Sequence, residues 1–129
     1  MRLWHSKLIP LLDNKRLSDV HMSCCNLRGR DWGKRNVAIN YLYDDPLGEE
    51  ALYAYHCKVL EEMRKRGFNF QQDWLGPNYC GKNRNLRIVD VDALWKVRAR
   101  EVPLLGHTDE ILQKDIKALR ERGLDIQLD

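Results

Sequence analysis

The spacing of apolar residues predicts a first helix. From Leu17 to Leu27, apolar positions recur at spacings of three, four and three, the period of one helix face. The polar residues 13–14 suit a cap at its start, and Gly29 suits its end. The pattern therefore predicts a helix up to Gly29, followed by a glycine-containing basic loop over residues 28–35.

A second, clearer helix follows. The acidic stretch 44–50 is suited to its start, and Gly67 follows a basic last turn, where a left-handed cap residue is favoured. One face of this helix carries Leu52, His56, Val59, Leu60 and Met63. The segment 36–43 has a β-like composition without clean alternation, which leaves its state open.

The second half of the chain predicts a long loop and two more helices. Residues 71–85 have no periodicity and contain Gly, Asn and Pro, which is typical of a loop. A short helix is expected over 90–97. Thr108 is suited to cap a last helix that ends at Gly123, with Ile111, Leu112, Ile116 and Leu119 facing inward. We expect a mainly α fold with three principal helices and long loops, forming a single domain over residues 1–129.

Composition excludes several classes of protein. No apolar run approaches the roughly 20 residues needed to span a bilayer. Arg2 is followed by a mixed polar stretch rather than the apolar core of a signal peptide, so we expect a cytoplasmic protein. The spacing of the four cysteines matches no zinc ribbon or redox motif. A metal site can be assembled from His21, Cys24, His56, Cys57 and Cys80, but buried thiols and a core histidine at position 56 are the simpler interpretation.

Charge is unevenly distributed along the chain. Residues 1–42 hold eight Lys or Arg and three acidic residues, whereas residues 43–70 hold four basic and six acidic ones. The positive field therefore lies in the first third, near the N-terminal amine. Such a patch suits a phosphate backbone.

Several motifs resemble those of the phage pyrimidine dimer DNA glycosylase (endonuclease V) family. The run CKVLEEMRKRGFNF (57–70) resembles one helix of that family, and LSDVH (17–21) resembles its Leu-x-Asp-x-His. A bacterial branch of the family is more similar still, through MRLWH (1–5), HMSCCNLRG (21–29), WGK (32–34) and PNYCGKN (77–83).

The resemblance implies a glycosylase and apurinic/apyrimidinic lyase chemistry. The α-amine of Met1 would attack C1′ of a damaged or abasic nucleotide and form an imine with the opened sugar, and β-elimination would then cut the strand. An α-amine has a pKa near 8, so much more of it is free base at neutral pH than of a lysine amine. Arg2 would grip a flanking phosphate, and His21 would lie close to the reacting sugar. No metal or cofactor is expected.

The expected partner is double-stranded DNA with a lesion or abasic site, bound by a monomer that associates with the nucleoid. Kinked DNA is the expected form, because an intact duplex hides C1′. Trp32 is suited to a stacking wedge or to an ordinary half-buried position. The residues expected to contact DNA are Arg28, Arg30, Trp32, Lys34, Arg35, Tyr79 and Lys82. Arg28 and Arg30 are expected to lie on an exposed turn after the first helix.

One feature departs from the family. The phage enzymes use a glutamate on the first helix, a few residues after the histidine, whereas this chain has no glutamate between His21 and Gly33 and carries Asn26 in that neighbourhood. Three interpretations stay open: another group takes the role, the substrate is an abasic site that already offers an aldehyde, or the protein binds DNA without cutting it. The alternative groups are Asp19, Asp31, His5, Glu61 and Glu62.

Overall fold

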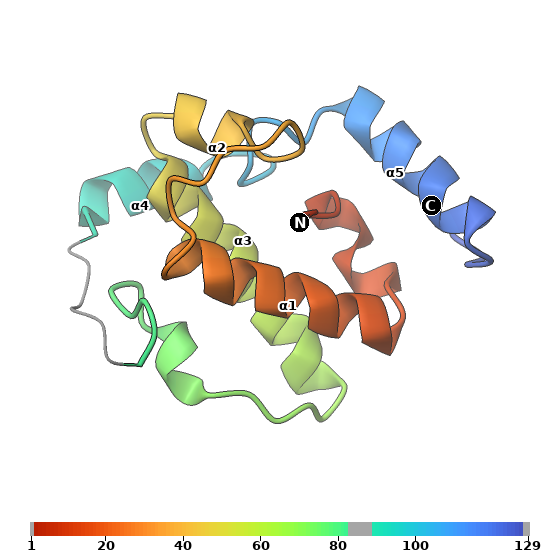
Figure 1. Cartoon of the computed structure of the whole chain (residues 1–129), viewed down its shortest axis with the longest axis horizontal. Coiled ribbons are helices and arrows are strands. Elements are labelled where there is room, and N and C mark those ends of the chain that lie inside the picture. The colour runs from red at the N-terminus through yellow and green to blue at the C-terminus, as the bar shows by residue number, and fades with distance from the viewer. Residues whose placement is uncertain (1, 83–88, 128–129) are drawn as a thin grey trace.

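The computed structural model describes residues 2–82 and 89–127, and its regular elements are helices (Figure 1). In chain order they are η1 (Ser6–Leu11), α1 (Asn14–Arg28), α2 (Tyr41–Asp44), α3 (Gly48–Lys65), η2 (Gln72–Leu75), α4 (Val91–Arg98) and α5 (Asp109–Glu121). The 3₁₀ turns η1 and η2 were not predicted from the sequence. The prediction of a mainly α fold is confirmed.

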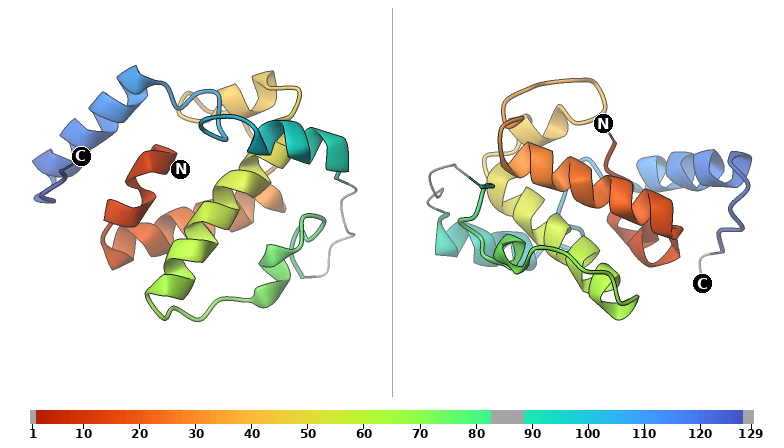
Figure 2. Two further views of the ribbon diagram at one scale, coloured as in Figure 1. Left: turned by 180° about the vertical axis from the view of Figure 1, so that it is seen from behind. Right: turned by 60° about the horizontal axis from the view of Figure 1, so that its bottom comes forward.

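The helices α1 and α3 form the centre of the fold, and they cross one another in both views of Figure 2. The predicted α1 is confirmed, with Asp13 at its N-cap position and Gly29 at its C-cap. The Asp13 side chain makes no capping hydrogen bond. Leu17 and Leu27, the ends of the predicted apolar stripe, are fully buried against the core.

The end of α3 follows the prediction closely. Gly67 has φ of 80°, the left-handed conformation that glycine adopts without a Cβ clash. The Phe68 amide then donates to the Met63 carbonyl at 2.9 Å, which folds the chain back onto the last turn. The same device ends α5, where Gly123 has φ of 91° and the Leu124 amide bonds back to Leu119 at 3.1 Å.

Residues 36–43, whose state the sequence pattern does not decide, form turns and the first part of the short α2 (Tyr41–Asp44). α4 begins at Val91, where the Asp90 carboxylate accepts the Asp92 amide at 2.9 Å. The Thr108 hydroxyl caps α5 by accepting the Ile111 amide at 3.2 Å, as predicted. Of the α5 residues expected to face inward, Leu112, Ile116 and Leu119 are buried, and Ile111 is half-buried.

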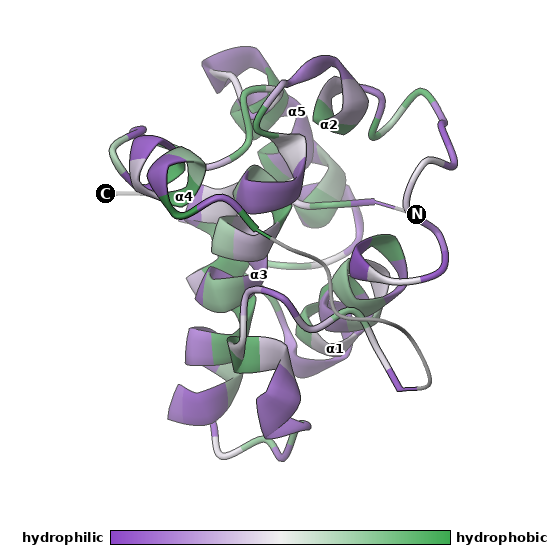
Figure 3. Cartoon of the chain, turned by 90° about the vertical axis from the view of Figure 1, so that its left-hand side faces the viewer, coloured by the Kyte–Doolittle hydropathy of each residue, from purple (hydrophilic) through white to green (hydrophobic). Residues whose placement is uncertain are grey.

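One hydrophobic cluster extends through the described chain, from Leu3 near the start to Ile126 near the end. Hydrophobic and hydrophilic residues occupy different faces of the helices in Figure 3, and the apolar faces of α1, α3 and α5 contribute to this cluster. Within residues 2–82 and 89–127, none of the helices combines the length and apolar character of a membrane span. η1 packs against α3 and α5, which places the N-terminal segment between these two helices (Figure 2).

Candidate functional site

The N-terminal segment is tied to α5 by a buried carboxylate. Asp115 Oδ1 accepts a hydrogen bond from Arg2 Nη2 at 2.6 Å, and its Oδ2 accepts the His5 backbone amide at 2.8 Å. The Arg2 guanidinium also lies over the Trp4 ring, 3.9 Å from the ring centroid. These contacts fix the conformation of Arg2, which was predicted to lie in the active site. Its side chain is still 41% exposed.

His107, on the connection before α5, holds the same segment from a second side. Its Nε2 lies 3.1 Å from the Leu3 carbonyl, and its Nδ1 accepts the Ser6 amide at 3.2 Å. Tyr55 donates its hydroxyl to the Trp4 carbonyl. Each residue from Leu3 to Ser6 therefore has a backbone group bonded to a side chain from another part of the fold. The N-terminal segment is an anchored element rather than a frayed end.

A cavity of about 350 Å³ lies beside this anchor. It is lined in part by Arg2, Ala38, Tyr41, His107 and Asp115. Burial, followed by the neighbouring His5, lowers the pKa of His107 to about 4, so His107 is neutral at physiological pH. Burial also lowers the pKa of His5, whose ring is 5.0 Å from that of His107 in a stacked arrangement.

A second cluster lies between α1 and α3. His21 Nδ1 is 2.9 Å from His56 Nε2, and His56 Nδ1 is 2.9 Å from Arg28 Nη1. Burial and the charge of Arg28 lower the pKa of His21, and the same causes lower the pKa of the fully buried His56 well below its usual value. The expectation that His56 is a core histidine with its hydrogen bonds satisfied is confirmed.

Arg28 overturns one expectation. It was predicted to be exposed and to contact phosphate, but it is 4% exposed. Its guanidinium donates to the carbonyls of Trp74 at 2.8 Å, Gly76 at 2.9 Å and Tyr79 at 3.1 Å, and these bonds fasten the returning loop to α1. The prediction of exposure was wrong because this loop covers the end of α1. In this conformation the Arg28 guanidinium is occupied by these three carbonyls and by His56.

His21 borders another cavity, of about 500 Å³, at the end of α1. Asn26 and Arg30 line it from α1 and the following turn, and Trp74 and Lys82 line it from the loop. The loop 29–40 connects the two cavities, because Gly29 and Arg30 border this one whereas Val37 and Ala38 border the cavity beside Arg2.

The sequence model of the family described as pyrimidine dimer DNA glycosylase matches residues 1–76, more than half of the chain. The chain belongs to the pyrimidine dimer DNA glycosylase family. Comparisons with curated proteins and with solved structures gave no significant match. Membership places the protein in a DNA-repair family, in agreement with the resemblance seen in the sequence.

The family match includes Arg2, His21 and the basic loop, but it ends before His107 and Asp115. Sequence reasoning missed both of these residues. The periodicity of α5 showed only its apolar face, Ile111, Leu112, Ile116 and Leu119, and this face does not include Asp115. A sequence signal was nevertheless present, because Asp115 is adjacent to the inward-facing Ile116 and so occupies the edge of that face.

Three of the cations predicted to contact DNA, all in the loop after α1, are exposed. The side chains of Arg30 and Lys34 are 68% and 75% exposed, and both lie near the Asp31 carboxylate, at 3.8 Å and 3.1 Å. Arg35 is half-exposed and pairs with Asp44 at 3.1 Å. The pair of Arg35 with Asp44 is exposed on both sides and therefore weak, whereas the Asp31 carboxylate beside Arg30 and Lys34 is 16% exposed.

The aromatic residues predicted to stack on DNA are partly packed. Trp32 is half-buried with its ring 4.9 Å from that of Tyr43, which agrees with the simpler of the two interpretations of this residue. Tyr79 lies edge-on to Trp74 at 4.7 Å. Lys82 is exposed at the cavity of His21. Met1, whose amine was predicted to be the nucleophile, lies outside the described residues.

The groups considered as substitutes for the family glutamate are dispersed. Both ring nitrogens of His5 are engaged, one with the Lys7 amide and one with the His107 carbonyl. Asp19 pairs with Lys15 on the surface of α1. Among the described residues, the carboxylate in contact with Arg2 is instead Asp115.

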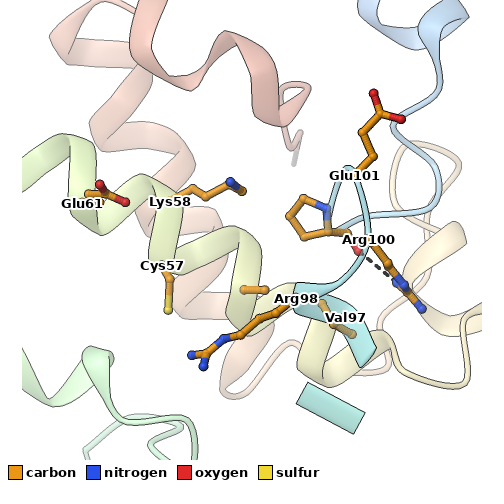
Figure 4. A pocket seen from close by; sticks show the side chains of 9 residues that line it. Cys57, Lys58, Glu61, Val97, Arg98, Arg100 and Glu101 are labelled. Carbon is orange, nitrogen blue, oxygen red and sulfur yellow. Dashed lines mark hydrogen bonds between the residues drawn. The ribbon is translucent and has the colours of Figure 1, made fainter. Parts of the chain in front are cut away.

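Glu61 belongs to a different site. It lines a cavity of about 190 Å³ between α3 and α4, together with Cys57, Lys58 and Arg98 (Figure 4). In this view the dashed line joins Arg100 to the carbonyl of Pro103, a 2.9 Å bond that closes the turn after α4. Glu62, the next residue, pairs with Arg66 at 3.7 Å. Neither glutamate borders the cavity beside Arg2.

The residues considered for a metal site come together only in part. His21 and His56 meet, and the cysteine that joins them is Cys25 rather than Cys24; the three ligand atoms lie within 4.8 Å of one another. Burial raises the pKa of Cys25 to about 12, so its sulfur is a thiol at neutral pH. The Arg28 guanidinium adjoins this cluster through His56, which adds a positive charge where a cation would bind.

Proposed function

We propose that the protein is a DNA-repair enzyme that forms an imine between its N-terminal α-amine and the sugar of an abasic or damaged nucleotide. The observation that carries this proposal is the anchoring of residues 2–6 by Asp115, His107 and Tyr55. A fold that holds the residues next to its terminus in this way limits where the first nitrogen can lie. The membership of the pyrimidine dimer DNA glycosylase family supports the same assignment.

At an abasic site the reaction needs no departing base. The free amine adds to the C1′ aldehyde, a C–N bond forms, and water leaves to give the imine. Removal of a proton from C2′ then breaks the bond between C3′ and its oxygen, and the 3′ phosphate is the leaving group. Hydrolysis of the imine returns the amine. At a damaged base, the amine would first displace the base from C1′, breaking the glycosidic bond.

The lack of a glutamate on α1 favours the abasic nucleotide as the better substrate. General acid–base assistance is worth about 10²–10⁴ in rate, and departure of a base depends on it more than addition to an existing aldehyde does. Asp115 does not replace the glutamate, because its two oxygens are bound by Arg2 and His5. We assign Asp115 the role of positioning Arg2 and the terminus.

The loop 29–40 supplies the DNA contact in this proposal. Arg30, Lys34 and Arg35 are exposed along 29–40, and this loop borders the cavity beside Arg2 at its other end. The strand would follow the loop, with the reacting sugar at the Arg2 cavity. A flanking phosphate would then lie within reach of the Arg2 guanidinium, which retains exposure beyond its bond to Asp115.

Borohydride trapping tests the proposal. A duplex with one abasic site is mixed with protein that has its native N-terminus, and reduction converts the imine into a stable amine. We expect a covalent adduct and strand cleavage. A protein with two extra residues before Met1 keeps an α-amine but displaces it, so adduct formation should fall at least 100-fold. Equal trapping by both proteins, or none by either, would overturn the proposal.

A non-catalytic DNA-binding protein is the second candidate, and the presence of Asn26 near the family's glutamate position is the observation that favours it. It predicts salt-sensitive binding of the same duplex by both the native and the extended protein, without adduct or cleavage.

A further inference from the structure

The Arg28–His56–His21 chain fixes the position of every proton within it. A guanidinium can only donate hydrogen bonds, so His56 Nδ1, 2.9 Å from Arg28 Nη1, must accept and carries no proton. The neutral His56 ring therefore holds its proton at Nε2. That nitrogen is 2.9 Å from His21 Nδ1, to which it donates.

The same reasoning extends to His21. Because His21 Nδ1 accepts a hydrogen bond, the proton of the neutral ring lies on Nε2. A second proton on His21 would place two N–H groups face to face, which would break the bond to His56. The depressed pKa of His21 agrees with this assignment. His21 thus acts as a hydrogen-bond donor at Nε2, with no free lone pair to serve as a base.

His21, which is 8% exposed, borders a cavity with cationic walls. His21 lines the 500 Å³ cavity, and Arg30 and Lys82 line it as well. In the described part of the chain, no acidic side chain contributes to its lining. Cys25, 3.7 Å from His21 Nε2, offers only a weak sulfur acceptor. Arg30 also lies 3.8 Å from the Asp31 carboxylate, which is not part of the lining. A neutral N–H donor and two cations in a lining without an acidic residue are complementary to an oxyanion.

We propose that this cavity binds a phosphate group of the DNA strand, with the Nε2–H of His21 as a preset neutral donor. Arg30 and Lys82 supply the charge, and His56 and Arg28 are positioning residues that act through His21. The inference rests on the proposed function for the identity of the strand. The segment 29–40 runs from this cavity to the cavity beside Arg2.

The alternative occupant is a metal ion held by His21, Cys25 and His56. A neutral imidazole has one lone pair for either a metal or a hydrogen bond. His56 uses its lone pair at Nδ1 for Arg28, so its Nε2 has none for a metal. Metal binding would require Arg28 to give up this contact. The hydrogen-bond chain and the metal site therefore exclude one another.

Nitrogen-15 NMR of the full chain tests the proposal directly. We expect both His21 and His56 to carry one proton, on Nε2, at pH 7. Titration with inorganic phosphate should shift the His21 Nε2–H signal while leaving His5 and His107 unchanged, since their ring nitrogens are engaged elsewhere. A proton on Nδ1 of His21, no response to phosphate, or stoichiometric zinc binding to this cluster would overturn the proposal.

Two variants of His56 separate positioning from packing. His56→Gln keeps an amide donor for His21 and an oxygen acceptor for Arg28, so phosphate affinity should stay within about threefold. His56→Leu removes both groups, and affinity should fall about tenfold or more, the value of one hydrogen bond to a charged acceptor. Equal affinity of the two folded variants would contradict the relay.

This test is independent of the imine chemistry. If trapping fails but phosphate still shifts His21, the cavity is a phosphate site of a non-catalytic DNA-binding protein. A duplex carrying a stable abasic analogue then distinguishes the source of the phosphate. It should displace inorganic phosphate from His21, and failure to compete would refute the assignment to a DNA strand.

Discussion

Asp115→Asn is the substitution that tests the anchored N-terminus most sharply. The native carboxylate accepts from Arg2 at 2.6 Å and from the His5 amide at 2.8 Å, and its side chain is 6% exposed. The neutral amide can accept only one of these bonds through its single oxygen, and its NH₂ group then faces the other donor. The variant therefore leaves one donor without an acceptor.

The magnitude follows from which donor loses its partner. A buried amide without an acceptor costs about 1–3 kcal/mol. Arg2 is 41% exposed, so water compensates much of its loss and that part is discounted. We expect the free energy of unfolding to fall by about 2 kcal/mol, which lowers Tm by roughly 6–10 °C for a chain of this size. At a temperature where the variant is still folded, the yield of the trapped adduct on an abasic duplex should nevertheless fall.

Thermal and urea unfolding, followed by circular dichroism, measure the effect. The matched control is Glu110→Gln, which makes the same change of charge on the same helix. Glu110 pairs with Lys114 at 3.3 Å, and both side chains are exposed, so the control should cost less than about 1 kcal/mol. Equal losses in the two variants would refute the reasoning that Asp115 anchors the terminus.

Three further changes test other parts of the fold. The pKa of His107 falls from 6.5 in the unfolded chain to about 4 in the folded protein, so its contribution of about 3 kcal/mol to stability is complete above pH 6.5 and is lost as the pH falls toward 4. Urea unfolding across this pH range should show a shallower dependence of stability on pH for His107→Gln than for the native protein. An unchanged pH dependence would contradict the assignment. A Cβ at Gly29 would lie 2.7 Å from the Cys80 carbonyl oxygen, whereas one at Gly76 meets its nearest atom at 3.4 Å, so Gly29→Ala should lower Tm strongly and Gly76→Ala little; equal Tm values would contradict the close approach. Arg30→Gln should reduce the slope of log binding constant against log salt concentration by about one for DNA binding. Arg28→Gln should instead lower the midpoint of urea unfolding, because three carbonyls lose their donor. A reduced salt slope in a stable Arg28→Gln protein would contradict the burial of Arg28.

The helices were predictable from the sequence because their signals are local. Gly67 and Gly123 lie within a turn of the helix ends that they define, and Thr108 bonds to an amide only three residues away. The apolar stripes of α1 and α3 also follow from spacing alone. The exposure of Arg30, Lys34 and Arg35 was predictable for the same reason, because they lie in a glycine-containing polar segment.

The candidate site was only half predictable because its contacts are distant in sequence. Arg2 and Asp115 are 113 residues apart, and no local pattern couples them. Arg28 was misjudged because its position at a helix end suggests exposure, whereas the carbonyls that bury it come from residues 46 to 51 positions later. Pairings of this kind depend on how the loops return over the core.

The most direct test of the central claim is to locate the trapped adduct by mass spectrometry. After borohydride reduction on an abasic duplex, the protein is digested and the sugar-bearing peptide is sequenced. We predict the modification on the α-nitrogen of Met1, with the lysines unmodified. A modification on a lysine such as Lys7, or protein that remains unmodified while binding the duplex, would contradict it.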